Sequence, residues 1–88
     1  MFELRFVPSW DKHYSSLDKS IKIRILKKLD QLKAKEKSRH LGLGLPFFVE
    51  EVGQYRIVFK QDDVAKIKEI YFIGDHKQYQ DWYSSFGF

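Results

Sequence analysis

The chain opens with large apolar residues at every second position. In residues 2–7, phenylalanine or leucine alternates with residues of the opposite face, and this two-residue period is typical of a β-strand with one side on a core. Pro8 ends the pattern. Ser9 then stands where it can cap a short helix that contains Trp10. The start of the chain therefore predicts a strand followed by a short helix.

Apolar positions then change to a helical period. Ile21, Ile25, Leu29 and Leu32 recur at the spacing of one helix face. This predicts a long second helix from Lys19 to about Lys37. The segment HLGLGLP that follows holds two glycines and a proline, which predicts a loop whose leucines pin it to the core.

Three further apolar segments have the pattern of consecutive strands. They are FFVEEV, YRIVFKQ and AKIKEIYFIG, separated by turns at Gly53-Gln54 and Asp62-Asp63, and such spacing favours an antiparallel meander. In the middle strand Tyr55, Ile57 and Phe59 point to one face. Arg56, Val58 and Lys60 point to the other.

The last segment, HKQYQDWYSSF, has the spacing of a short helix. Asp75 can cap it, and Trp82 and Phe86 are expected to dock on the core. The predicted fold is α+β, an antiparallel sheet of about four strands with two N-terminal helices packed on one face and a short C-terminal helical segment. Residues 1–88 are expected to form a single domain. Its shared core should include Ile25, Leu29, Tyr55, Ile57 and Phe59.

Composition excludes several classes of site. The chain has no cysteine, so it can form neither a disulfide framework nor a thiolate site. Its histidines, His13, His40 and His76, fall in unrelated segments without the spacing of metal ligands. No apolar run approaches the roughly 18 residues that span a bilayer. We therefore expect a cytoplasmic protein that needs no metal and no cofactor.

Basic residues are concentrated between Lys19 and Arg39. This segment carries nine basic and two acidic residues, a net charge of +7, whereas the rest of the chain carries −3. Such a block favours polyanions, including nucleic acid and ribosome surfaces. On a helix, Arg24, Lys28 and Lys35 would form one basic ridge beside the apolar stripe. The alternative is a solvated helix face without a ligand.

A histidine directly after the most apolar strand suggests chemistry. If the last strand pairs with the strand that carries Arg56 and Lys60, His76 can lie near that cationic face. Metal-independent RNA cleavage needs a proton-transfer group, for which histidine is suited, and cations that stabilise charge on the phosphate. Arginine binds phosphate oxygens through forked donors, and a tyrosine can stack on a base.

The element order, with GQYRIVFK at residues 53–60 and IYFIGDHKQY at 70–79, resembles the RelE/ParE superfamily of toxins from type II toxin–antitoxin pairs. The resemblance implies a ribosome-dependent mRNA endonuclease that binds a cognate antitoxin, the ribosome and mRNA. Arg56 matches the family's arginine in the YR strand, and His76 and Tyr79 match its later arginine or histidine and tyrosine. These three are the catalytic residues that the resemblance implies.

The chain also departs from the RelE pattern. RelE-like ribonucleases often carry lysines on the strand before the YR strand, where this chain has Phe47 and Val49 followed by Glu50 and Glu51. Other cations are then needed for RNA, and the candidate RNA-binding residues are Arg24, Lys28, Lys33, Lys35, Lys37, Arg39, Lys60 and Lys77. Two alternatives stay open: a ParE-like toxin that inhibits DNA gyrase, and a nucleic-acid-binding module without catalysis.

Overall fold

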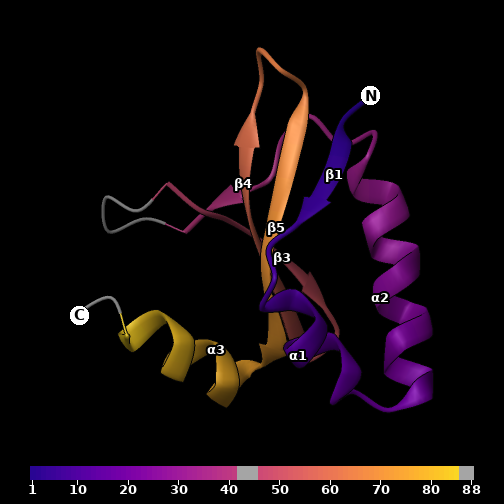
Figure 1. Cartoon of the computed structure of the whole chain (residues 1–88), viewed down its shortest axis with the longest axis vertical. Helices are drawn as coiled ribbons and strands as arrows, with labels where there is room; N and C mark the ends of the chain where they lie inside the picture. The colour runs from indigo at the N-terminus through magenta and orange to yellow at the C-terminus, as the bar shows by residue number, and fades with distance from the viewer. Residues whose placement is uncertain (42–45, 86–88) are drawn as a thin grey trace.

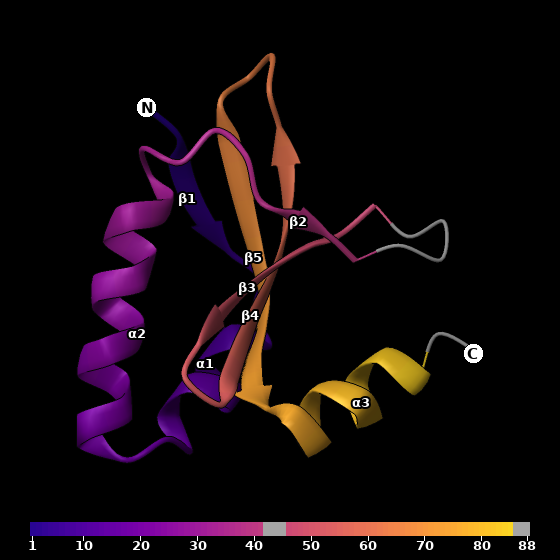
Figure 2. The same ribbon diagram turned by 180° about the vertical axis from the view of Figure 1, so that it is seen from behind.

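The computed structural model describes residues 1–41 and 46–85. It has an α+β fold in which one twisted sheet lies between helices (Figures 1 and 2). The elements, in chain order, are β1 (Glu3–Phe6), α1 (Trp10–Ser15), α2 (Lys19–Leu32), β2 (Arg39–His40), β3 (Phe48–Val52), β4 (Tyr55–Asp62), β5 (Ile67–Asp75) and α3 (His76–Ser84).

The sheet has five strands in the order β1-β5-β4-β3-β2. Strands β3, β4 and β5 form the predicted antiparallel meander. Two features of the sheet differ from the sequence prediction. The two-residue strand β2 forms in a segment read as loop, because Leu41 returns the chain to Phe47 through a backbone hydrogen bond of 2.8 Å. Strand β1 pairs with β5 in parallel, because a helical crossover separates it from the meander.

One face of the sheet packs against α1 and α2. Ile57 and Phe59 from β4 are fully buried there beside Ile25 of α2. Tyr55 is partly buried in the same cluster. The predicted sidedness of β4 is therefore confirmed. Its cause is the two-residue alternation that directs one set of apolar side chains toward the helices.

The opposite face of the sheet packs against α3. In Figure 1, α2 and α3 lie on opposite sides of the sheet. Val58 and Phe72 are buried on this face. Trp82 of α3 stacks on Phe72 with ring centroids 5.3 Å apart and meets Phe47 edge-on at the same distance. The predicted docking of Trp82 on the core is therefore confirmed. The predictions for Phe86 and for the leucines at 43 and 45 lie outside the described residues.

Side-chain caps fix where α2 and α3 begin. Asp18 accepts a hydrogen bond from the Ile21 amide at 3.0 Å at the start of α2. Asp75 and Gln78 form a reciprocal capping box at the start of α3, so the predicted cap at Asp75 is confirmed. Ser9 stands before α1 as predicted, but its side chain makes no capping hydrogen bond.

Helix α2 ends at Leu32, although its sequence predicts helix to about Lys37. The reason is a lysine from β5. The Lys68 ammonium donates hydrogen bonds to the carbonyl oxygens of Leu32 and Lys35, both at 2.6 Å. The Phe2 amide donates to the carbonyl oxygen of Lys33 at 2.6 Å. These donors satisfy carbonyl groups that a longer helix would have bonded internally.

A buried carboxylate joins β3 to the segment that starts in α2. Glu50 is 7% exposed, and its oxygens lie 2.7 Å from the Lys35 ammonium and 3.4 Å from that of Lys28. Burial opposes the ionised form, but the hydrogen bond from Lys35 and the charges of Lys35 and Lys28 together hold the pKa of Glu50 below its ordinary value. The ionised carboxylate therefore belongs to the folded state.

We expect Glu50 to contribute stability that acid removes. Because its folded pKa lies below the ordinary value of 4.5, this contribution is present above that pH and is lost as pH falls through the folded pKa. Glu50→Gln should lower the free energy of unfolding at pH 7 and flatten its decline below pH 4.5. Urea unfolding across that range measures both effects. Glu36→Gln, an exposed control, should change neither, and an unchanged acid profile in Glu50→Gln would contradict the assignment.

Candidate functional site

A cleft lies beside the β3–β4 turn, where β5 ends and α3 begins. Figure 2 shows where these segments lie in the fold. Its volume is about 440 Å³, and a pocket of this size holds a small ligand. Two segments that are distant in sequence contribute to it, the β3–β4 hairpin and the junction of β5 with α3. The lining residues are Glu51, Gly53, Gln54, Arg56, Asp75, His76 and Lys77.

The sheet positions Arg56 in this cleft. Arg56 lies directly opposite Glu51 of β3 and Gly74 of β5 in the strand register. Its guanidinium covers the ring of Tyr79 at 4.8 Å from the centroid, which is within the range of a cation–π contact. The Tyr79 ring supports the Arg56 guanidinium from one side, and Arg56 lines the cleft.

The start of α3 positions His76. The capping box at Asp75 and Gln78 fixes the first turn of the helix, in which His76 is the first residue. The side chain is exposed and lines the cleft with Arg56. The predicted proximity of His76 to Arg56 is therefore observed. The two residues lie close together because β4 and β5 are antiparallel, so the start of β4 at Tyr55 pairs with the end of β5 at Asp75.

Tyr79 has a different environment from the one its sequence suggests. It is 8% exposed and belongs to the core cluster on this face, and Arg56 covers its ring. Burial raises the pKa of the Tyr79 phenol, so the hydroxyl keeps its proton at neutral pH. A covered ring cannot stack on a nucleotide base. The Tyr79 ring is therefore a packing surface for the Arg56 guanidinium.

Glu51 is a cleft residue that sequence reasoning did not select. Its carboxylate is half-exposed and accepts a hydrogen bond from Arg39 at 2.9 Å. The two-residue alternation of β3 was the available signal, because it separates Glu51 from the buried Glu50. The cleft thus contains a carboxylate, a guanidinium and an imidazole, which together can bind a phosphate and transfer protons.

The predicted basic ridge is divided in the structure. Lys35 lies beyond the end of α2, and both Lys28 and Lys35 pair with Glu50. Lys33 pairs with Asp30 at 3.7 Å, and Arg39 pairs with Glu51. The charge of +7 counted for residues 19–39 therefore overstates the positive potential of this surface. Glu50 and Glu51 of β3 are not in that segment of the sequence, but they neutralise part of its charge in the fold. Replacing Lys28 and Lys35 would also leave the buried Glu50 unpaired, so these two lysines contribute to folding stability.

The remaining candidate cations lie in different places. Lys77 lines the cleft, whereas Lys60 lies farther along β4, with its ammonium 5.1 Å from the Tyr71 ring centroid. Arg24 packs its guanidinium against Gly53, where a side chain would collide with it. Lys37 is exposed. Within residues 1–41 and 46–85, none of these four makes an ion pair with an acid.

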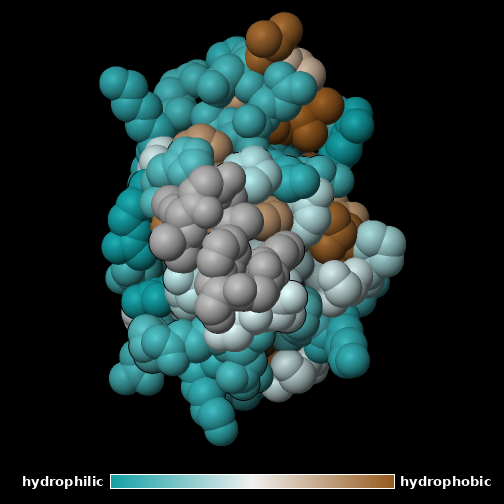
Figure 3. All heavy atoms as spheres, turned by 90° about the vertical axis from the view of Figure 1, so that its left-hand side faces the viewer, coloured by the Kyte–Doolittle hydropathy of each residue, from teal (hydrophilic) through white to brown (hydrophobic). Residues whose placement is uncertain are grey.

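Hydrophilic residues cover most of the visible surface on the side that carries α3 (Figure 3). Among the described residues, no group of three or more histidines and acids is arranged to hold a metal ion. No helix in the described part of the chain is long and apolar enough to cross a membrane.

Solved structures of RelE toxins have this fold. A chain of the intact Escherichia coli RelBE toxin–antitoxin complex aligns with a TM-score of 0.73 and 16% identity, over 85% of this chain and 96% of that one. The isolated E. coli RelE toxin aligns with a TM-score of 0.70 and 16% identity, over 98% and 99%. The archaeal RelE–RelB complex from Pyrococcus horikoshii gives 0.69 and 22%, over 84% and 93%.

No family sequence model and no curated protein sequence matches the chain. The likeness is therefore one of structure at low identity, and it extends over nearly the whole chain. The chain has the RelE fold. The resemblance inferred from residues 53–60 and 70–79 is confirmed at the level of the fold.

Proposed function

We propose that this protein is the toxin of a type II toxin–antitoxin pair and that it cleaves mRNA on the ribosome without a metal ion. The observation that carries the proposal is the meeting of Arg56, His76 and Glu51 in one cleft of a RelE fold. The fold neighbours crystallised with RelB antitoxins support an antitoxin as partner. The proposed site of action is the cytoplasm.

The proposed reaction is attack of a ribose 2′-hydroxyl on the adjacent phosphate. A base must accept the 2′-hydroxyl proton, and an acid must give a proton to the leaving 5′-oxygen. His76 and Glu51 supply two proton-transfer groups, and Arg56 stabilises the charge that develops on the phosphate oxygens. Tyr79 holds the Arg56 guanidinium in place. Lys77, Lys60 and Arg24 remain candidate contacts to the RNA backbone.

Primer extension on mRNA with purified translating ribosomes tests this function. The wild-type chain should produce defined breaks within the ribosome-bound message. Because ribosomes need Mg²⁺ to stay assembled, they are first stabilised with a polyamine, and EDTA is then added. The breaks should persist in the presence of EDTA. Intact mRNA together with inhibition of DNA gyrase supercoiling would favour the ParE-like alternative. Intact mRNA with salt-sensitive RNA binding would leave a non-catalytic binding module.

A further inference from the structure

The cleft has two walls, and the strands support them unequally. The wall that carries Arg56 and His76 belongs to β4, β5 and the start of α3, and β4 pairs with β5 along its whole length. The wall that carries Glu51 belongs to the end of β3. On its outer side β3 pairs only with the two-residue strand β2, at Phe48 and Val49. The described strands therefore leave the Glu51 wall without a neighbour on its outer side.

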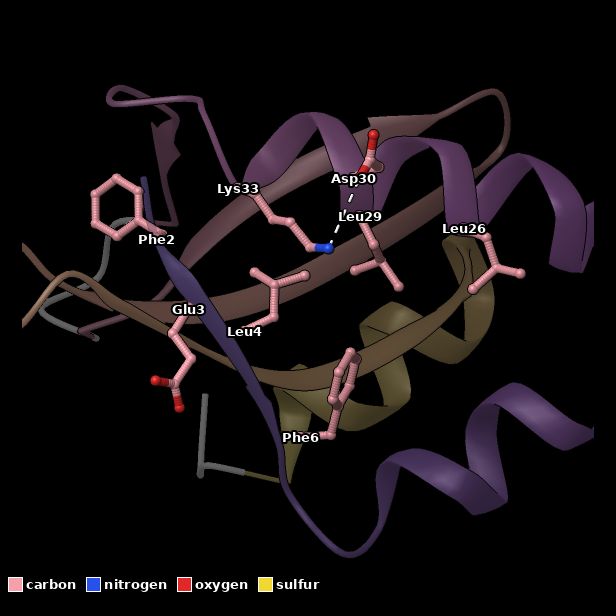
Figure 4. Close-up of a pocket in the computed structure, with 8 residues that line it drawn as sticks. All are labelled: Phe2, Glu3, Leu4, Phe6, Leu26, Leu29, Asp30 and Lys33. Carbon is pink, nitrogen blue, oxygen red and sulfur yellow. Dashed lines mark ion pairs between the residues drawn. The ribbon is translucent and has the colours of Figure 1, made fainter.

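Helix α2 supplies the missing neighbour. One flank of α2 faces β1, and Leu26 and Leu29 line a pocket there (Figure 4). Arg24 and Lys28 are four residues apart and share the other flank of the helix. The Lys28 ammonium lies 3.4 Å from the carboxylate of Glu50 in β3. Arg24 lies one helical turn closer to the start of α2, beside the β3–β4 turn (Figure 2).

The Arg24 guanidinium packs directly on Gly53 in this turn. A Cβ atom added at Gly53 would overlap Nη2 of Arg24, and it would lie 3.3 Å from Cζ and 3.5 Å from Nη1. The planar end of Arg24 therefore occupies the space in which another residue would have its own side chain. Among the residues that the structure describes, Arg24 makes no ion pair with an acid. A salt bridge therefore does not explain why the guanidinium lies against the turn.

Glycine is required at position 53 for two separate reasons. Val52 pairs with Tyr55 across a two-residue loop, in which Gly53 has φ +59 and Gln54 has no positive φ. Glycine with positive φ at the first loop position is typical of a type II′ hairpin. Asparagine and aspartate also adopt positive φ, but either would place a Cβ atom in the Arg24 guanidinium. The contact with Arg24 therefore excludes residues that the turn alone would accept.

Arg24 reaches the turn from a rigid base. Ile25, the next residue of α2, is fully buried in the core cluster that contains Ile57. Gly53 and Gln54 are exposed, and exposed turns are among the more mobile parts of a fold when few contacts hold them. A helix fixed by the core thus holds an exposed turn that lines the cleft.

We propose that Arg24 is a positioning residue that holds the Gly53–Gln54 turn in place. The turn continues the end of β3, so its position sets how far Glu51 lies from His76 across the cleft. Arg39 binds the Glu51 carboxylate, whereas Arg24 holds the backbone beyond it. The effect on catalysis rests on the proposed nuclease. In an active site, a displacement of about 1 Å can slow the reaction by about a hundredfold.

NMR relaxation of the full chain tests the contact without ribosomes. The Gly53 and Gln54 amides should have order parameters near those of rigid backbone, about 0.85, and these should fall toward about 0.6 in Arg24→Ala. Lys27→Ala removes a neighbouring exposed charge from α2 and should leave both amides unchanged. Gly53→Asn should lower the midpoint of urea unfolding in the wild type. It should lower the midpoint less in Arg24→Ala, where the shortened side chain leaves room for the new Cβ.

Single-turnover cleavage of ribosome-bound mRNA tests the consequence for catalysis. Arg24→Ala should lower the cleavage rate at saturating ribosome concentration by about tenfold. The half-saturating ribosome concentration and its salt dependence should stay nearly unchanged. Arg24→Lys keeps the charge but lacks the planar group that covers Gly53, so it should not restore the rate. Lys27→Ala should cleave at the wild-type rate.

Two outcomes would overturn the proposal. Unchanged order parameters in Arg24→Ala would show that the turn needs no support from α2. Full activity of Arg24→Lys, with a raised half-saturating concentration and a weaker salt dependence in Arg24→Ala, would assign the guanidinium to an RNA phosphate. If the wild type leaves mRNA intact, the proposed nuclease fails, and the order parameters still decide whether Arg24 holds the turn.

Discussion

His76→Ala should slow cleavage of ribosome-bound mRNA by about a hundredfold or more, the scale for losing a general acid or base. His76 is the exposed imidazole of the cleft, and the capping box fixes its place at the start of α3. Arg56→Ala should cause a similar or larger loss, because no other guanidinium lines the described cleft to stabilise phosphate charge. Single-turnover primer extension at equal folded concentration measures both rates.

Matched variants separate catalysis from structure. Arg5→Ala removes an exposed arginine from the edge strand and should leave the cleavage rate unchanged. Tyr79→Leu keeps an apolar side chain under Arg56 but removes the ring, so it should mainly raise the half-saturating ribosome concentration through a less ordered guanidinium. If His76→Ala cleaves as fast as the wild type, proton transfer belongs to Glu51 or Lys77 and the site must be rebuilt around them.

Lys68→Ala should destabilise the fold by about 3 kcal/mol or more, because it leaves a cavity and removes the ammonium donor from the carbonyl oxygens of Leu32 and Lys35. Lys68 is fully buried, and its ammonium lies 4.7 and 5.2 Å from the ring centroids of Phe2 and Phe59. Burial lowers the pKa of its ammonium. The two carbonyl oxygens at the end of α2 nevertheless give the ammonium its hydrogen bonds.

Urea unfolding of a second variant separates the contribution of the cavity from that of the lost hydrogen bonds. Lys68→Met fills most of the volume but cannot donate, so its loss should be smaller, about 1–3 kcal/mol, and should represent the hydrogen bonds. Lys27→Ala, on the exposed side of α2, should stay within about 0.5 kcal/mol of the wild type. A Lys68→Met variant as stable as the wild type would show that the carbonyl groups do not need the ammonium.

Local patterns predicted the elements of this fold because each pattern has one structural period. The alternation in Tyr55, Ile57 and Phe59 determined which face of β4 meets the helices. The end of α2 could not be predicted in the same way. It depends on Lys68, which is 36 residues from Leu32 in sequence and reaches it only through the tertiary fold.

In the candidate site too, local patterns were predictable and tertiary contacts were not. Arg56 and His76 were predicted to lie together, because adjacent antiparallel strands bring the start of one beside the end of the next. The covering of Tyr79 by Arg56 and the pairing of Lys35 with Glu50 were not predictable. Charge along the sequence does not show which acids fold back onto the basic segment, so Lys35 was assigned to RNA.

The pairing of β1 with β5 affects the time at which the sheet can form during synthesis. β1 is made first, yet its only partner in the described sheet begins at Ile67. Contacts of such long sequence separation close slowly, because the intervening chain must be ordered first. Until β5 and the start of α3 have emerged, Phe2 and Leu4 have no strand beside them, and the cleft has neither Asp75 nor His76. In a nascent chain of this protein the cleft is therefore incomplete until β5 and the start of α3 have been made.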